Sequence, residues 1–291
     1  MSEAGDLQPK HSVREGLQQR ESKYGHGDNQ RVWEADYKGV KIGINLGDIA
    51  SAPTEAIMCP TTPWLEVGGG GIENRIADVA GEEVFGKYTK ELIGLLTDIR
   101  SNDTQTSLNA SEKLSKFLAT NTGMKLGKSS EEVRSDVIQA TATHNLGKDV
   151  GEHVALFYGG SVPAPAGKEL GKKGIKIVVL TNVTPEGKKM QAEDMVRFTE
   201  SAAQAASLTG VDSLTVPAVG TGFAAAFGFG LSQAESMGGF FKGATEFVDH
   251  NQGNTSLKRI DYNMYAKPSL ETAKQVSGML SKQPQAVKLL T

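Results

Sequence analysis

The stretch that decides the fold is Trp64–Gly81, WLEVGGGGIENRIADVAG, in which four adjacent glycines directly precede a helical pattern. Glycine loses more conformational freedom on folding than any other residue, so four in a row need a reason. Consecutive N–H groups without Cβ atoms can line a concave nest, and the N-terminus of the following helix adds further donors. The stretch therefore predicts a backbone site for an anion such as a phosphate, with a hinge or a tight turn as the alternative.

Strand and helix patterns alternate on both sides of these glycines. Upstream, Arg31–Ile49 indicates two strands joined near Lys38 and Gly39, and Glu55–Pro60 indicates a short buried strand. A helix is expected from about Ile72. Further along, strands are expected at 175–183, 211–219 and 257–265, and helices at 188–210, 231–251 and 269–280. This order predicts an α/β fold, a three-layer α/β/α sandwich with a mixed, largely parallel central sheet.

The middle of the chain is harder to interpret. Helical spacing is present at 90–100 and 110–120 with a polar break at 101–109, whereas 136–142 and 153–160 look like strands and 161–174 like a loop. Residues 1–30 are polar and without apolar periodicity, which is typical of a flexible tail. The expected organisation is a tail at 1–30 and one domain at 31–291, with an inserted or enlarged segment at about 86–174.

Composition excludes several classes of function. The 291 residues carry a formal charge of −3 without a long basic stripe, which argues against a nucleic-acid partner. The single cysteine, Cys59, excludes an intramolecular disulfide and a cysteine-based zinc cluster, and the five histidines show no metal spacing. No metal or cofactor is expected. No signal-peptide or membrane-spanning pattern is present, so a cytoplasmic protein is expected, although secretion without a cleaved signal would leave the same pattern.

Three candidate features lie where predicted strands end. Asp48 follows the second strand, the glycine run follows the third, and Gly220-Thr221-Gly222 follows the strand at 211–219. In parallel α/β sheets, ligands bind beyond the carboxyl ends of the strands. Two glycine loops meeting at such an edge could clamp a diphosphate, so the joint placement favours a nucleotide-like ligand.

The order of these motifs resembles that of the macro domain, the ADP-ribose-binding module. The resemblance covers roughly 31–85 and 175–282, and the middle of the chain is longer than the usual domain. Its matching elements are Gly47-Asp48-Ile49, Gly68–Gly71 with Ile72, Ala80-Gly81, VLTNVTP from Val179, VPAVGTGF from Val216, and RIDYNMY from Arg259.

The resemblance implies a role for individual residues. Asp48, with the Ile49 backbone beside it, would accept a hydrogen bond from the adenine amino group, and Tyr265 would stack on the adenine. The remaining ligand-binding positions would wrap the diphosphate and ribose: Gly69, Gly70, Gly71 and Ile72 from one loop, and Gly220, Thr221, Gly222 and Phe223 from the other. The implied partner is ADP-ribose or a related small nucleotide, with an ADP-ribosylated protein as a further candidate.

The chain departs from the family where catalysis would need it. Pro60 and Pro63 occupy the two Asn positions of the family, and proline offers neither an amide side chain nor a backbone N–H. Glu73 stands at the place of an acidic residue, where it could act as a general base or simply favour the helix dipole. Hydrolysis of ADP-ribosyl groups is therefore left open. Alternatives are an interaction protein that has lost the pocket and a hydrolase of another nucleotide-derived substrate.

Overall fold

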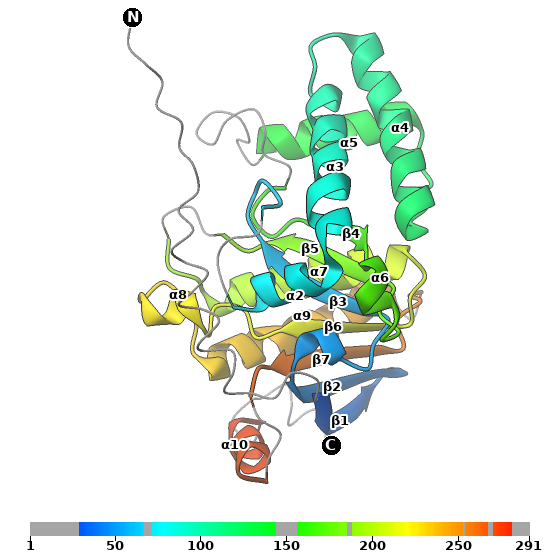
Figure 1. The fold of residues 1–291 in the computed structure, drawn as a ribbon. Helices are drawn as coiled ribbons and strands as arrows, with labels where there is room; N and C mark the ends of the chain where they lie inside the picture. Colours follow the sequence, from blue (N-terminus) through cyan, green and yellow to red (C-terminus); the bar gives the residue numbers. More distant parts are fainter. Residues whose placement is uncertain are drawn as a thin grey trace, which may run out of the picture.

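The computed structural model describes residues 29–66, 71–143, 156–184, 188–252, 254–266 and 270–280. A seven-stranded sheet lies at its centre, in the order β1-β2-β7-β6-β3-β5-β4 (Figure 1). The strands are β1 (Asn29–Tyr37), β2 (Val40–Gly47), β3 (Ala56–Thr61), β4 (Ser161–Pro165), β5 (Ile177–Asn182), β6 (Ser213–Pro217) and β7 (Arg259–Met264). The first of them begins two residues inside the range expected for the tail, of which residues 1–28 lie outside the described part.

The sheet is mixed and largely parallel, as the sequence predicts. Strands β2, β7, β6, β3 and β5 run parallel to one another, whereas the edge strands β1 and β4 pair antiparallel with β2 and β5, respectively. All six residues of β5 are buried, which is why its sequence is a nearly continuous apolar run.

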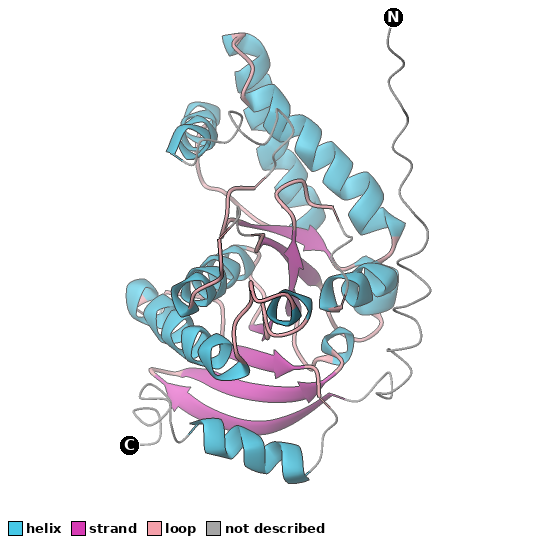
Figure 2. Ribbon diagram, turned by 90° about the vertical axis from the view of Figure 1, so that its left-hand side faces the viewer, coloured by secondary structure: helices cyan, strands magenta, loops and turns pink. Residues whose placement is uncertain are grey.

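Helices cover both faces of the sheet (Figure 2). One face packs against α7 (Ala192–Leu208) and α9 (Gln233–Asn251), and the other packs against α2 (Ile72–Ala80) and α6 (Gly167–Gly171). Alternation along β3 separates the two layers, since Met58 belongs to the first cluster and Ile57 and Cys59 to the second. The expected three-layer sandwich is confirmed.

Three helices extend the second layer past the edge strand β4 (Figure 1): α3 (Thr89–Ile99), α4 (Thr104–Thr122) and α5 (Ser130–Thr143). A short π-helix at Glu83–Tyr88 leads into them. Its last residue, Tyr88, contacts both the sheet and these helices. Its hydroxyl donates to the carbonyl of Pro163 at 2.6 Å, and its ring stacks on Phe117 at 4.7 Å between centroids. Burial raises the pKa of this hydroxyl.

Several predictions for the middle of the chain are wrong. The expected strand at 136–142 is part of α5, and residues 156–160 form turns rather than a strand. The expected loop at 161–174 contains β4 and α6. The two prolines of β4 made this segment look like a loop in the sequence. They are tolerated because β4 is an edge strand, where a proline nitrogen can face away from the neighbouring strand and no hydrogen bond of the sheet is lost. The polar break is shorter than expected, because Asp103 caps α4 by accepting from the N–H of Thr106 at 2.9 Å.

The remaining helices are short or lie near the end of the chain. They are the 3₁₀ turn at Ile49–Ser51, α8 (Phe223–Ala226) and α10 (Leu270–Leu280). Within the described ranges, none of the helices combines the length and the apolar character that crossing a membrane requires.

Candidate functional site

The predicted ligand residues follow strands whose carboxyl ends share one edge of the sheet. Asp48 follows β2, Tyr265 follows β7, Gly220 lies shortly after β6, and Gly71 comes after β3. Strands β3 and β6 are direct neighbours, so the two glycine loops start side by side. At about 4.8 Å per strand, the ends of β2 and β3 lie about 14 Å apart along this edge. Gly69 and Gly70 lie outside the described residues.

Two asparagines, the buried Asn263 and the half-buried Asn29, hold the turn that carries Asp48. The side-chain amide of Asn263 donates to the carbonyl of Gly47 at 3.1 Å, and that of Asn29 donates to the carbonyl of Asp48 at 3.1 Å. Asn29 also donates to Oδ1 of Asn263 at 2.8 Å, so strands β1 and β7 together hold two successive carbonyls of this turn. Sequence reasoning missed both asparagines. A polar residue at alternate positions of the apolar strand β7 was the available signal.

The Asp48 carboxylate is occupied within the protein. Its Oδ1 accepts from the N–H of Ala50 at 3.0 Å, which caps the short 3₁₀ turn. Its Oδ2 accepts from Nε of Arg75 at 3.1 Å and from a terminal guanidinium nitrogen at 2.6 Å. The Asp48 side chain is 2% exposed and the Arg75 side chain 22%. Arg75 lies on α2 and was also missed, because no local pattern links it to Asp48.

Glu73 lies in the first turn of α2 and is buried, with 8% of its surface exposed. Burial, and to a smaller extent the nearby Glu73 carboxylate, raise the pKa of the Cys59 thiol on β3. Gly71, with φ of 65°, precedes the helix as its N-cap. Glu73 thus lies near Cys59 of β3, two residues after Gly71. Ile72 beside it is half-buried against the same core cluster.

The two prolines at the family's Asn positions are built into the backbone here. Pro60 lies within β3, in register with Thr181 of β5. The carbonyl of Pro63 accepts from the N–H of Leu156 at 3.1 Å, where the chain returns from the helices α3–α5 to the sheet. This connection brings the long middle segment to the base of the first glycine loop.

A backbone hydrogen bond joins the two ends of the second glycine loop, which runs from Gly220 to Gly230. Gly220, with φ of 79°, accepts at its carbonyl from the N–H of Leu231 at 3.1 Å. A Cβ on Gly230 would lie 2.0 Å from that carbonyl oxygen, so glycine is required there by close approach. Thr221 Oγ1 donates to the carbonyl of Ala218 at 2.9 Å. Gly222 precedes α8, and no atom lies within 4 Å of where its Cβ would be.

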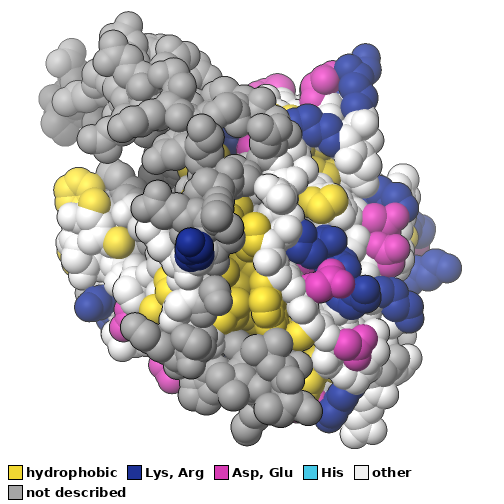
Figure 3. All heavy atoms as spheres, turned by 90° about the horizontal axis from the view of Figure 1, so that it is seen from below, with side chains coloured by type: hydrophobic (Ala, Val, Ile, Leu, Met, Phe, Trp, Pro, Cys, Tyr) yellow, Lys and Arg dark blue, Asp and Glu magenta, His cyan; other side chains and the backbone are white. Residues whose placement is uncertain are grey.

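Exposed aromatic side chains flank this loop. Phe227 is 62% exposed, Phe229 55% and Tyr265 38%. In Figure 3, hydrophobic side chains are exposed at the left of the molecule, the side on which α8 lies in Figure 1. The Phe223 side chain lies outside what the structure describes. The expected stacking of Tyr265 on adenine stays a prediction.

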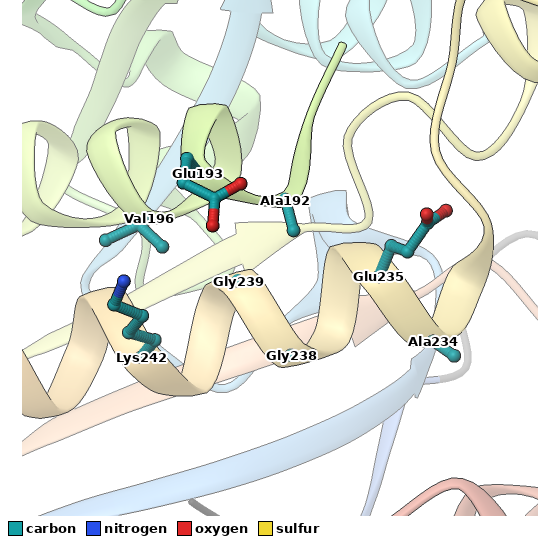
Figure 4. Close-up of a pocket in the computed structure, with 8 residues that line it drawn as sticks. All are labelled: Ala192, Glu193, Val196, Ala234, Glu235, Gly238, Gly239 and Lys242. Carbon is teal, nitrogen blue, oxygen red and sulfur yellow. The ribbon is translucent and has the colours of Figure 1, made fainter.

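Two hollows lie elsewhere on the described surface. One, of about 330 Å³, lies between α7 and α9 and includes Glu193, Glu235 and Lys242 (Figure 4). The other, of about 420 Å³, lies at the opposite edge of the sheet, where β2, β6 and β7 begin. Neither contains a residue predicted to bind the nucleotide. Among the residues described, no group of three or more His, Cys, Asp or Glu side chains could hold a metal ion.

Comparison with known proteins identifies the fold to which this structure is similar. No family model matches the chain, and no curated protein matches it. Among solved structures, a macrodomain of Oceanobacillus iheyensis with ADP is similar, with a TM-score of 0.50 and 11% identity over 88% of this chain and 97% of that one. A mutant of it with ADPR gives a TM-score of 0.50 and 11% identity over 88% and 98%. This chain therefore has the macrodomain fold.

Proposed function

We propose that this protein binds ADP-ribose or a related adenine nucleotide at the carboxyl edge of its sheet. The observation that supports the proposal is that Asp48, Gly71 and Gly220 follow parallel strands whose carboxyl ends share one edge of a sheet with the macrodomain fold. The two similar macrodomain structures of Oceanobacillus iheyensis are named with ADP and with ADPR. Adenine is selected by a carboxylate because its amino group is a donor at the position where guanine presents an acceptor.

The backbone around Gly71 and Gly222 supports the diphosphate part of the proposal. Gly71 adopts a positive φ at the N-terminus of the nine-residue helix α2, and Gly222 has open space beside it. Unpaired N–H groups at a helix N-terminus favour an anion. The half-buried Ile72 follows Gly71 as the first residue of α2.

Hydrolysis is a separate part of the proposal and rests on Glu73. This carboxylate in the first turn of α2 would activate a water molecule. Pro60 and Pro63 provide no side-chain amide to position a ribose, and their backbone nitrogens cannot donate. Release of ADP-ribose from a mono-ADP-ribosylated protein, compared between the natural chain and Glu73→Gln, tests this role. Release that Glu73→Gln leaves unchanged would remove Glu73 from the chemistry.

Calorimetric titration with ADP-ribose, AMP and NAD tests binding. ADP-ribose should bind most tightly, and Asp48→Ala should weaken its binding, because the Asp48 carboxylate also caps the turn at Ile49–Ser51 beside the expected adenine position. Asp78→Ala is the matched control, because Asp78 is an exposed acid on α2. No binding of any of these nucleotides by the natural chain would refute the proposal.

One observation favours a second candidate function. The Asp48 carboxylate is closed off by Arg75 and is 2% exposed, as expected if the pocket has been lost and the fold serves protein interactions. The helices α3–α5 and the exposed phenylalanines near α8 would then contact the partner. The same titrations separate the two candidates, since this one predicts no nucleotide binding.

A further inference from the structure

We propose that Arg75 sets the base selectivity of this site by competing with adenine for the Asp48 carboxylate. The inference rests on the proposed function, because it concerns the nucleotide that the site selects. It assigns a specificity role to a residue that lies 27 positions from Asp48 in the sequence.

The contact between the two side chains is well formed. Two guanidinium nitrogens of Arg75 donate to a single oxygen, Oδ2, at 2.6 and 3.1 Å. The Arg75 backbone is held in place as well, since its N–H donates to the carbonyl of Gly71 at 3.1 Å. Arg75 thus reaches Asp48 from the helix turn that directly follows the glycine run.

The Asp48 carboxylate has little capacity left to accept a hydrogen bond from a ligand. A carboxylate oxygen has two lone pairs, so Arg75 fills Oδ2, and the N–H of Ala50 fills half of Oδ1 at 3.0 Å. The Asp48 side chain is 2% exposed, so a ligand reaches the last lone pair only if a neighbouring group moves. The backbone of Asp48 is in turn fixed by Asn29 and Asn263, which leaves the Arg75 side chain as the part that moves.

This exchange disfavours adenine. An adenine amino group is a neutral donor, and it reaches the remaining lone pair of Oδ1 only if Arg75 moves away and gives up its stronger, charge-assisted hydrogen bonds to Oδ2. The amino group therefore contributes little net affinity in the natural chain. A base with an oxygen at that position, such as hypoxanthine, should bind about equally well, because the carboxylate does not read the difference.

Calorimetry with ADP-ribose and with inosine diphosphate ribose tests this reading in the natural chain and in Arg75→Met. The natural chain should bind the two ligands within about threefold of each other. Arg75→Met should bind ADP-ribose about tenfold more tightly and leave the inosine ligand nearly unchanged, since one hydrogen bond to a charged group becomes available. Adding Asp48→Ala should abolish the gain.

Controls keep the result interpretable. Arg134→Met removes an arginine whose Nε donates to Ser107 in the α3–α5 helices, and it should change neither affinity. If Arg75→Met fails to fold because Asp48 is left unpaired, Arg75→Lys keeps the charge with a weaker hold and should show a smaller gain in the same direction. Equal or weaker ADP-ribose binding by the Arg75 variant that folds refutes the competition. If neither the natural chain nor that variant binds either ligand, the proposed function fails instead.

Discussion

Gly43→Ala is expected to destabilise the protein strongly although it adds a single methyl group. Gly43 lies on β2 in direct register with Asp261 of β7, whose side chain is fully buried. A Cβ at this position would lie 2.3 Å from Oδ1 of Asp261 and 3.2 Å from the carbonyl oxygen of Trp33. An unstrained contact requires the carboxylate to retreat by about 1 Å, which the packed sheet resists.

The expected cost follows from what holds Asp261. Its carboxylate accepts from Arg31 at 2.9 Å, from Asn45 at 3.2 Å and from Arg259 at 3.3 Å. Losing one hydrogen bond to a charged group costs about 1.5–3 kcal/mol, and overpacking costs about 1–3 kcal/mol. Alanine regains about 0.5–1 kcal/mol over glycine in a strand. The free energy of unfolding should therefore fall by about 2–5 kcal/mol.

Urea unfolding measures this change, and Gly94→Ala is the matched control. Gly94 is exposed on α3, and its added Cβ would meet no atom within 4 Å. That variant should stabilise the protein by about 0.5–1 kcal/mol, since alanine is the better helix former.

The reasoning is refuted if Gly43→Ala unfolds within about 0.5 kcal/mol of the natural chain, the usual limit for a neutral change. A double-mutant cycle with Asp261→Ala identifies the cause, because the cost of Gly43→Ala should largely disappear once the carboxylate is gone. A cost that persists would place the strain at the Trp33 carbonyl instead.

Three further predictions concern the second loop, the helical extension and acid stability. Gly230→Ala would place a Cβ 2.0 Å from the carbonyl oxygen of Gly220, so it should open the loop and weaken ADP-ribose binding in calorimetry by about tenfold; unchanged affinity would show that the loop does not contact the ligand. Tyr88→Phe keeps the ring and removes a hydrogen bond to β4, so it should cost about 1–2 kcal/mol in urea unfolding, and no change would contradict the bond. A hydrogen bond from Lys38 lowers the pKa of Asp249, so its stabilising effect is present above about pH 4 and is lost as the pH falls further. Lys38→Met should therefore lessen the fall in unfolding temperature between about pH 6 and pH 3, and a parallel profile would argue against the pair.

Much of the fold can be predicted from local patterns. The strand β5 is apolar throughout because both of its faces are covered, and α7 and α9 show regular apolar spacing because one side of each packs on the sheet. The middle of the chain could not be predicted in the same way. The strand β4 contains two prolines that look like a loop until its place at the edge is known, and α5 is too weakly amphipathic to be recognised.

The candidate site divides along the same line. Glycine and acid positions such as Gly220 and Asp48 were recognisable because each follows a strand within a few residues. The residues that act on them come from distant segments: Asn263 lies on the last strand, Arg75 on a helix, and Asn29 at the start of the first strand. Local sequence shows at most that Asn263 is a polar residue on an apolar strand, and it does not identify the partners, since each contact forms only when the strands are ordered in space.

The sequence by itself determined the class of fold and most of its parallel strands, because hydrophobic periodicity and glycine positions act over short distances along the chain. It also placed Asp48 at the end of a strand. Only the tertiary structure decided that this carboxylate is paired with Arg75 and almost excluded from solvent. Pairing of that kind depends on which side chains meet across the sheet and helices, and the energy of a charge depends on the burial that results.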